Sequence, residues 1–508
     1  MSKRYANIPS FPFLKDLNID LEARQKLSIN LARIYSGSSD IIETPMCRDH
    51  GNERILSEWN KVFQDNKSSM NDVLLKLEEL QLSKIGPRSI SKPWSYRRSG
   101  IKEYYEDTHI NYDLLDATPE ATRDKGILRP ISVENATKLM KNSTNSGLPF
   151  YTRKGLVKDR ILARFEYYLK RMDPCVLFTR TQEQEKTRDV WGYPMADSIN
   201  EMRFYAPLLA YQRKLSWRSS LNGPEFVNRR LTYIIFTAIK LGLDLISIDF
   251  SKYDRSVKFK YQVKISQYYK YLFQKFSHSE IDYITKRKGS IGLVTPDGIF
   301  KGEHALPSGA TLTNEDGSVG QFIIARDSKC IVDDLFDTQG DDGCYAIRKD
   351  RVKLFINWFK KYGFDVNEDK SYVSSNYVVY LQNLYHVDYQ QNGVITGIYP
   401  VYRALNRLLY QERWSNFEDY SIAGKDYFSI RAICILENCK YHPLFEKLVR
   451  FVLSYDKYKL AYSNSGLTQY IKMISQTSGI EGILVNQYGD NLKGINDFET
   501  VKLIRSLI

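Results

Sequence analysis

The feature that most constrains the fold is an apolar strand that ends in a carboxylate. Residues 243–250 read LDLISIDF, and this apolar, β-branched run predicts a buried strand with Asp249 at its end. Further along, two short extended runs within residues 329–348 flank a Gly-Asp-Asp sequence, which predicts a β-hairpin with Asp341 and Asp342 at its tip. If the strand and the hairpin pair, the carboxylates of Asp249 and Asp341 can face each other.

Carboxylates that meet in this way suit metal-assisted phosphoryl transfer. That chemistry uses two divalent cations about 3.5–4 Å apart. Such hard cations take oxygen ligands from several strands. Asp249, Asp341 and Asp342 are therefore candidate catalytic residues and metal ligands. Magnesium is the expected ion and manganese a possible substitute. Taken alone, a Gly-Asp-Asp sequence is also ordinary turn chemistry, because Gly340 lets the backbone turn tightly.

A Ser-Gly loop lies between the two aspartate motifs. Ser308 and Gly309 precede Thr313 and Asn314, whose short polar side chains can face one side of the following helix. Together with Asp254, these groups can hydrogen-bond a ribose 2′-hydroxyl, which separates ribonucleotides from deoxyribonucleotides. The alternative is a plain helix cap, since serine and threonine commonly begin helices. Three such motifs in this order are much less expected by chance than any one alone.

A basic, aromatic segment precedes these motifs. Residues 153–188 hold ten Lys or Arg against five acids. Cations bind phosphates and rings stack on bases, so the mixture predicts a groove for single-stranded nucleic acid. A solvated basic helix with a buried aromatic stripe is the equally supported alternative. The rings concerned are Phe165, Tyr167, Tyr168 and Phe178.

The overall charge and the cysteines limit the function classes. The chain of 508 residues has a formal net charge of +13, which favours polyanionic partners, meaning nucleic acid or acidic membranes. The alternative is a charged surface that serves ordinary solubility. Its six cysteines form no C-x-x-C pair, so we expect neither a zinc site nor a disulfide framework. A reducing compartment is therefore expected for this protein. The most apolar stretch, 233–250, is interrupted by Lys240 and Asp244. It falls short of the roughly 20 apolar residues of a membrane span, and no signal peptide is evident, so we expect a soluble protein.

Helical patterns occupy much of the remaining chain. The first 85 residues or so are predicted to be helical, and residues 89–108 to form a polar linker or surface arm. A helix is expected from Val352 to about Tyr362, where Gly363 would end it. A strongly amphipathic helix is expected over residues 442–460.

These residues resemble the catalytic motifs of viral RNA-dependent RNA polymerases. The match spans about residues 144–385, and the form of the Ser-Gly motif is most similar to picobirnaviruses, with partitiviruses next. One departure is Gln339, where several relatives carry a bulkier hydrophobic residue. The matching segments are TNSGLPF (144–150, motif G), EKTRDVWGYP (185–194, F), DFSKYD (249–254, A), SGATLTN (308–314, B), QGDD (339–342, C), KYGFDVNEDKS (361–371, D) and VVYLQNLY (378–385, E).

The resemblance implies a role for each matching residue. Asp249 and Asp341 would bind both metals with support from Asp342, and Asp254, Ser308, Thr313 and Asn314, in the loop begun by Ser308 and Gly309, would check the sugar. Lys186 and Arg188 would hold the triphosphate, unless they are solvated cations. Lys370 would be the general acid for the leaving pyrophosphate, unless it is a plain surface lysine. Ser146, Gly147 and Pro149 would line the template entry, although Ser-Gly and Pro also make ordinary turns.

The implied fold is an α+β right hand with an antiparallel palm sheet and largely helical fingers and thumb. By analogy, the N-terminal extension would bridge fingers and thumb. The expected divisions are the extension 1–99, fingers 100–243 and 266–304, palm 244–265 and 305–395, and thumb 396–508.

The function so implied is RNA synthesis on an RNA template, with single- and double-stranded RNA and ribonucleoside triphosphates as partners. The resemblance further implies a monomer that associates with viral capsid protein, in the virion interior and the host cytoplasm, with no membrane partner. Two rivals remain open at this point. One is the reverse transcriptase of a retroelement, and the other is a basic RNA-binding protein without catalysis.

Overall fold

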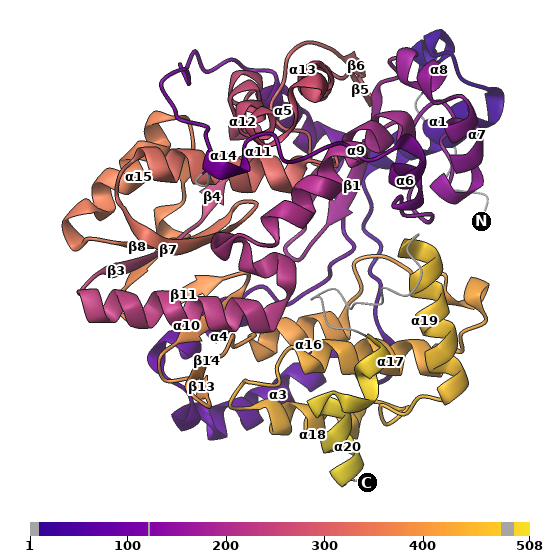
Figure 1. The fold of residues 1–508 in the computed structure, drawn as a ribbon. Helices are drawn as coiled ribbons and strands as arrows, with labels where there is room; N and C mark the ends of the chain where they lie inside the picture. Colours follow the sequence, from indigo (N-terminus) through magenta and orange to yellow (C-terminus); the bar gives the residue numbers. More distant parts are fainter. Residues whose placement is uncertain (1–9, 120–121, 479–491, 508) are drawn as a thin grey trace.

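The computed structural model describes residues 10–119, 122–478 and 492–507, and in it helices surround several small sheets (Figure 1). The N-terminal part is helical, as the sequence predicts, and hydrogen-bonding side chains fix several helix starts. Asp20, for example, accepts a hydrogen bond from the backbone N–H of Ala23 at 2.8 Å. The helices of this part are α1 (Leu21–Ser36), α2 (Pro45–His50), α3 (Asn52–Asp65), α4 (Asp72–Leu82) and α5 (Trp94–Tyr104).

The helix α5 corrects the prediction of a linker over residues 89–108. Trp94, Ile101 and Tyr104 are buried in a core with Trp191, and buried Arg97 is paired with Asp189 at 2.7 Å. This segment is rich in polar and basic residues, but its apolar residues recur at helical spacing on one face. Burial of that face against distant strands overrides the loop-like composition.

The next part of the chain combines helices with a four-stranded sheet in the order β2-β1-β5-β6. Strand β1 pairs antiparallel with β2 and parallel with β5. The elements are α6 (Val133–Lys138), α7 (Lys158–Ala163), α8 (Phe165–Lys170), β1 (Cys175–Thr181), β2 (Thr187–Gly192), α9 (Met195–Gln212), α10 (Pro224–Leu241), α13 (His278–Lys288), β5 (Leu293–Thr295) and β6 (Gly298–Phe300).

The basic segment 153–188 does not form one aromatic groove. Phe165 and Tyr168 are buried in a core with α9, and the ring of Phe178 stacks on Tyr151, so these rings are not free to stack on bases. Tyr167 is 48% exposed and is the exception among the four. The buried aromatic stripe, which the sequence left open as an alternative, is the correct description for most of this segment.

The sheet that carries the aspartates has the order β10-β3-β8-β7, and its strand β3 is buried on both faces. Leu245 points to a core with α10, whereas Ile246 points to a core with α12, α14 and α15, as the two-residue period of a strand requires. The predicted strand, hairpin and helix before Gly363 are confirmed. The elements are β3 (Asp244–Ile248), β4 (Phe250–Ser251), α11 (Tyr253–Ser256), α12 (Phe259–Leu272), α14 (Thr313–Asp327), β7 (Ile331–Gln339), β8 (Asp342–Ile347), α15 (Val352–Lys361), β9 (Asp365–Val366) and β10 (Tyr372–Ser374).

The C-terminal part is mostly helical and shares one core with the N-terminal helices. Trp59 and Leu74 from α3 and α4 pack with residues of α16, α17 and α18, while α1 lies beside β1 at the other side of the molecule (Figure 1). The predicted helix over 442–460 is confirmed, with narrower bounds. The elements are β11 (Tyr377–Tyr380), β12 (Asn383–His386), β13 (Gln390–Gln391), β14 (Val394–Ile395), α16 (Val401–Leu409), α17 (Gly424–Glu437), α18 (Phe445–Tyr455), α19 (Asn464–Ser478) and α20 (Glu499–Leu507).

In the described part of the chain, no helix combines the length and the hydropathy that crossing a membrane requires.

Candidate active site

The pairing of β3 with the β7–β8 hairpin brings the three aspartates together. Ile248 is paired with Gly343, and Asp249 follows directly after β3. Gln339 and Asp342 close a two-residue turn, in which Gly340 adopts a φ of 64°. Such left-handed backbone is favourable for glycine, so the sequence of the turn matches its geometry. The backbone N–H of Asp249 also donates to Ser371 Oγ at 3.1 Å, which fixes the end of the strand.

The three carboxylates lie within electrostatic reach of one another. Burial raises the pKa of Asp249, and the charge of Asp341 raises it further, while Lys370 and Lys186 oppose the shift. Burial, with the charges of Asp341 and Asp249, raises the pKa of Asp342 to about 7. Like charges this close are unfavourable without a compensating cation.

The donor set fits magnesium. No group of three or more His, Cys, Asp or Glu side chains in the described residues is arranged to hold a metal ion unaided. Magnesium, however, is usually bound by one or two carboxylates together with waters and substrate phosphates, rather than by a complete protein cage. Asp249 and Asp341, supported by Asp342, supply carboxylates of that kind, and their mutual repulsion is relieved by a cation.

Asp254 is brought to the Ser-Gly loop. The hydroxyl of Ser308 donates a hydrogen bond to the carboxylate of Asp254. The backbone N–H of Leu306 donates to the backbone carbonyl of Asp254 at 3.1 Å. Burial raises the pKa of Asp254 to about 6, against the effect of the Ser308 hydroxyl. Thr313 behaves differently, because its hydroxyl donates to the carbonyls of Pro307 and Ala310, both at 2.9 Å, and so closes the loop itself.

The Ser-Gly loop is held from two sides. Gly309 has a φ of 157°, and a Cβ atom there would overlap the carbonyl oxygen of Trp191. The carboxylate of buried Glu201 accepts hydrogen bonds from the backbone N–H groups of Thr311, at 2.6 Å, and Leu312, at 3.2 Å. Burial raises the pKa of Glu201 to about 7, while the charge of Lys288 opposes the shift. The sequence gave no sign of this role, since Glu201 lies in a helix more than a hundred residues away.

Asn314 lies beside the aspartate turn. Its Oδ1 accepts a hydrogen bond from Gln339 Nε2 at 3.3 Å, and Gln339 Oε1 accepts from Ser220 Oγ at 2.8 Å. Ser318 Oγ accepts from the backbone N–H of Gly340 at 2.7 Å. Helix α14 therefore both carries Asn314 and contacts the Gly340–Asp341 turn.

Sequence reasoning named Asn314 but missed the supporting residues Ser318 and Gln321, although a signal existed. Asn314, Ser318 and Gln321 are spaced at i, i+4 and i+7, which places them on one face of a helix. Gln321 Nε2 donates to the carbonyl of Gly340 at 3.1 Å, and Gln321 Oε1 accepts from Tyr345 at 2.5 Å. A polar stripe on an otherwise buried helix indicates a polar partner, but not which one.

The predicted basic residues lie within electrostatic reach of the aspartates. Lys186 lies in the turn after β1, where its backbone carbonyl accepts a hydrogen bond from the N–H of Gln182 at 2.9 Å. Arg188 lies in β2. Burial lowers the pKa of Lys186, helped by the charges of Arg188 and Lys370 and opposed by Asp249. Lys370 is exposed at the end of a short 3₁₀ helix, Glu368–Lys370.

The proposed template residues have mainly structural contacts. Ser146 is buried, its backbone N–H donates to the carbonyl of Thr152 at 2.6 Å, and its carbonyl accepts from Met195 at 2.8 Å. Gly147 has a φ of 63°, where a Cβ atom would overlap Tyr193. Pro149 is half-buried after a cis peptide bond. Among the described residues, no hydrogen bond or ion pair is observed between these three residues and the aspartates. The ordinary-turn alternative accounts for their observed contacts.

Comparison with known proteins shows which proteins this chain resembles. No family model matches the chain. A protein described as a potential RNA-dependent RNA polymerase of a human picobirnavirus is 27% identical over 503 residues, covering 92% of this chain and 88% of that protein. This chain is a homologue of picobirnavirus RNA-dependent RNA polymerases. The sequence-based resemblance to picobirnavirus polymerases is thereby confirmed.

Solved structures agree with this homology. The crystal structure of the RNA-dependent RNA polymerase of a human picobirnavirus superposes with a TM-score of 0.77 at 24% identity, covering 94% of this chain and 96% of that one. An insertion-loop deletion mutant of a human picobirnavirus polymerase gives the same TM-score and coverage at 25% identity. The likeness extends over nearly the whole chain, so it confirms the predicted α+β fold of a right-hand polymerase.

Proposed function

We propose that this chain is an RNA-directed RNA polymerase that copies RNA from ribonucleoside triphosphates in viral genome replication and transcription. The observation that carries the proposal is the meeting of Asp249, Asp341 and Asp342 beside the Asp254–Ser308 pair, in a homologue of picobirnavirus polymerases. In this proposal the central sheet with β11 and β12 is the palm. The segments 100–243 and 266–304 are the fingers, 396–508 is the thumb, and 1–99 bridges them.

The reaction is in-line attack of a primer or initiating 3′-hydroxyl on the α-phosphate, with pyrophosphate leaving. Asp249 and Asp341, supported by Asp342, would hold magnesium, or manganese in its place. When bound by these aspartates, such cations would supply activation of the hydroxyl and neutralisation of the triphosphate charge. Lys186 and Arg188 bind the triphosphate through charge-assisted hydrogen bonds. The exposed Lys370 donates a proton to the departing pyrophosphate.

The sugar is checked by Asp254, Ser308 and Asn314, while Thr313 and Gly309 shape the loop that presents them. The observed contacts support this division, since Ser308 bonds to Asp254 whereas Thr313 bonds to loop carbonyls. The hydrogen bond that Gln339 Nε2 donates to Asn314 Oδ1 restricts rotation of the Asn314 amide group. Ser146, Gly147 and Pro149 remain proposed template contacts, although their observed contacts are those of an ordinary turn.

Template and partners follow from the same proposal. Single- and double-stranded RNA are the templates, viral capsid protein is the expected associate, and the polymerase acts as a monomer in the virion interior and the host cytoplasm. A reverse transcriptase of a retroelement and a non-catalytic RNA-binding protein remain the rivals that the experiment must separate.

The direct test is incorporation of labelled nucleotides by the full chain on single- and double-stranded RNA. We expect magnesium-dependent RNA synthesis that stops when EDTA removes the metal, and at least about 100-fold preference for ribonucleotides over deoxyribonucleotides, because a site that recognises a hydroxyl rejects the analogue lacking it. A preference for deoxyribonucleotides would favour the reverse transcriptase. RNA binding by folded protein with no synthesis under magnesium or manganese would favour the non-catalytic alternative.

Replacing Asn314 by alanine should relax the choice of sugar. Loss of one hydrogen bond to the 2′-hydroxyl costs about 0.5–1.5 kcal/mol. We therefore expect the ratio of ribonucleotide to deoxyribonucleotide efficiency to fall up to about tenfold. Steady-state incorporation of matched ribo- and deoxyribonucleotides measures this ratio. Asn135→Ala, on an exposed position of α6, is the matched control and should leave it unchanged. An unchanged ratio in the Asn314 variant would remove Asn314 from the sugar check.

A further inference from the structure

The end of helix α5 lies against the turn that carries Asp254, next to α11 (Figure 1). The carboxylate of Glu103 accepts hydrogen bonds from Lys252 Nζ, at 2.9 Å to each oxygen, and from Arg255 Nη1 at 2.9 Å. Hydrogen bonds between charged groups are stronger than those between neutral groups. Because Lys252 and Arg255 stand on either side of Tyr253 and Asp254 in the chain, one carboxylate holds both sides of Asp254.

The same end of α5 also contacts the start of the Ser-Gly loop. The backbone carbonyl of Tyr104 accepts a hydrogen bond from the N–H of Ala305 at 2.8 Å, and the carbonyl of Glu103 accepts one from Lys258 Nζ at 2.5 Å. Burial raises the pKa of Tyr104 to about 12, and the charge of Asp254 adds to this effect, so a neutral hydroxyl lies near that carboxylate. The end of α5 therefore contacts both segments that form the Asp254–Ser308 pair.

Arg255 packs closely against α5, and a glycine makes this approach possible. A Cβ atom at Gly100 would lie 2.8 Å from Arg255 Nη2, which is closer than ordinary contacts allow. The guanidinium also lies over the ring of Tyr104, 5.4 Å from its centroid, and Nη2 is 3.6 Å from Asp189 Oδ2. Several groups thus fix Arg255, whereas Lys252 depends on fewer.

Lys252 has a backbone conformation that needs support from its surroundings. Its φ of 56° lies in the left-handed region, which is unfavourable for a residue with a side chain and persists where other contacts hold it. Among the residues that the structure describes, Glu103 is the only partner of the Lys252 side chain in a hydrogen bond or ion pair. Lys252 directly precedes α11, so its conformation sets the direction of the helical turn that contains Asp254.

These contacts give Glu103 a task beyond stability. We propose that Glu103 is a positioning residue for the choice of sugar, which acts through Lys252 and Arg255 to place the Asp254 carboxylate where it meets the 2′-hydroxyl of a ribonucleotide. This inference rests on the proposed function, in which Asp254 checks the sugar. A pre-positioned acceptor favours the substrate that carries the hydroxyl. A deoxyribonucleotide lacks the group that Asp254 would contact, and it gains nothing from the placement.

The test is Glu103→Gln, which keeps the shape of the side chain and removes its charge. Steady-state incorporation by the full chain gives kcat/KM for a ribonucleotide and for the matching deoxyribonucleotide. We expect the ribonucleotide value to fall about fivefold, a modest loss because the Glu103 side chain is 32% exposed. The deoxyribonucleotide value should change less than about twofold. A merely structural role would instead lower both values alike.

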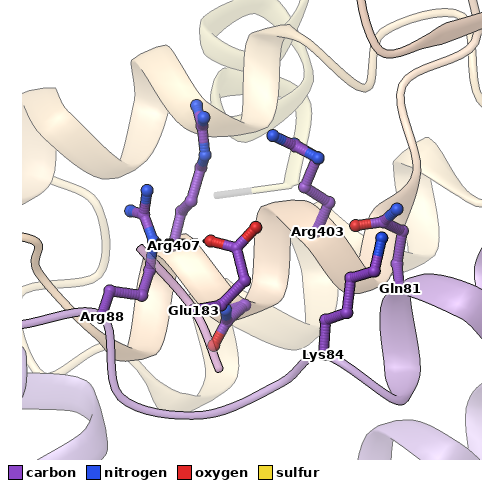
Figure 2. A pocket seen from close by; sticks show the side chains of 7 residues that line it. Gln81, Lys84, Arg88, Glu183, Arg403 and Arg407 are labelled. Carbon is purple, nitrogen blue, oxygen red and sulfur yellow. Dashed lines mark ion pairs between the residues drawn. The ribbon is translucent and has the colours of Figure 1, made fainter. Parts of the chain in front are cut away.

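Two other acids serve as controls. Glu106→Gln removes an exposed charge just beyond α5 and should leave both values unchanged, because Glu106 bonds to neither Lys252 nor Arg255. Glu183→Gln tests the triphosphate side of the site, since the charge of Glu183 reaches Lys186. It should change both nucleotides by the same factor. Figure 2 shows the carboxylate of Glu183 among the basic side chains of Lys84, Arg88, Arg403 and Arg407.

A double substitution tests the route through Lys252. Lys252→Gln alone should lower the ribonucleotide value about twofold, and it should cause no further loss in the Glu103→Gln protein, because residues that act through one contact are not additive. The Lys252 side chain is 59% exposed, so this variant also serves if Glu103→Gln fails to fold. Losses that simply add would contradict the proposed route.

Amide hydrogen exchange tests the same contact without any nucleotide. In the turn, the N–H of Arg255 donates to the carbonyl of Lys252 at 2.9 Å, and that of Val257 to the carbonyl of Tyr253 at 3.3 Å. We expect exchange in the segment 250–258 to be at least about threefold faster in Glu103→Gln and unchanged in Glu106→Gln.

The outcomes separate this inference from the proposed function. An active wild type whose Glu103→Gln variant keeps its ratio of ribonucleotide to deoxyribonucleotide efficiency would overturn the inference alone, as would exchange at the wild-type rate. A wild type that makes no RNA would overturn the proposed function and, with it, the role in sugar choice. In that case, faster exchange in the variant would still show that Glu103 holds the turn.

Discussion

Replacing Asp341 by alanine is expected to reduce RNA synthesis at least about 1,000-fold while the protein stays folded. Asp341 lies exposed at the tip of the β7–β8 hairpin, where its side chain supports no core contact. Its charge, however, raises the pKa of both Asp249 and Asp342, so it faces both carboxylates. In the proposed mechanism, this substitution would remove one of the two main carboxylates, a ligand that both cations would share. The effect on the chemical step should therefore far exceed the effect on stability.

The measurement is single-turnover incorporation of a labelled ribonucleotide, with thermal unfolding monitored in parallel. Asp350→Ala is the matched control, since Asp350 is an exposed aspartate on the 3₁₀ helix Lys349–Arg351 just after β8. We expect it to retain wild-type incorporation. Activity of the Asp341 variant comparable to that of the wild type would remove the metal role from this turn, even if the fold assignment stood.

The central sheet could be predicted because its information is local. The run that ends at Asp249 and the two runs around Asp341 each show the pattern of a strand, and a buried sheet leaves few ways to pair them. The Asp254–Ser308 contact was also anticipated, since both residues belong to recognisable motifs. These predictions depended on short segments and on their order along the chain.

Contacts between distant segments could not be predicted in the same way. Glu201 accepts a hydrogen bond from the Ser-Gly loop, and Gln339 donates one to Asn314. The sequence around Glu201 or Gln339 does not indicate which residue it will contact. Likewise, the composition of α5 is that of a loop, and only packing against Trp191 makes it a buried helix. Tyr168 could equally have been exposed, because a ring at helical spacing suits a core as well as a nucleic-acid groove. Tertiary packing, which a single sequence does not state, decides such cases.

The largest effect on stability is expected at a buried ion pair next to Asn314, the residue proposed to check the sugar. Arg218 and Glu315 are both fully buried, with Nη2 and Oε1 2.9 Å apart. Glu315 follows Asn314, whose Nδ2 donates to the same Oε1 at 3.4 Å. Replacing Arg218 by methionine leaves an uncompensated carboxylate in the interior. We expect this to lower the free energy of unfolding by about 3–5 kcal/mol.

The dependence on pH gives this prediction a distinctive sign. Burial already raises the pKa of Glu315, and the charge of Arg218 limits that rise, so loss of Arg218 must raise the pKa further. A carboxyl group with a raised pKa in the folded state keeps a proton that the unfolded chain releases. Stability therefore falls as the pH rises through the unfolded-state value of about 4.3 towards the folded-state value. The Arg218 variant should accordingly be less destabilised at pH 5 than at pH 8.

A second substitution in the same site should separate charge from packing. In Arg218→Met/Glu315→Gln no charge is left unpaired, so we expect most of the lost stability to return, because a buried ion pair can be replaced by uncharged groups at small cost. The exposed pair of Arg450 and Glu446, 2.7 Å apart, is the control, and Arg450→Met should cost at most about 1 kcal/mol. Denaturant unfolding at pH 5 and pH 8 measures all three variants. If the double variant is as unstable as the single one, shape rather than charge maintains this site. In that case the ion pair would not be what fixes the position of Asn314 at the start of α14.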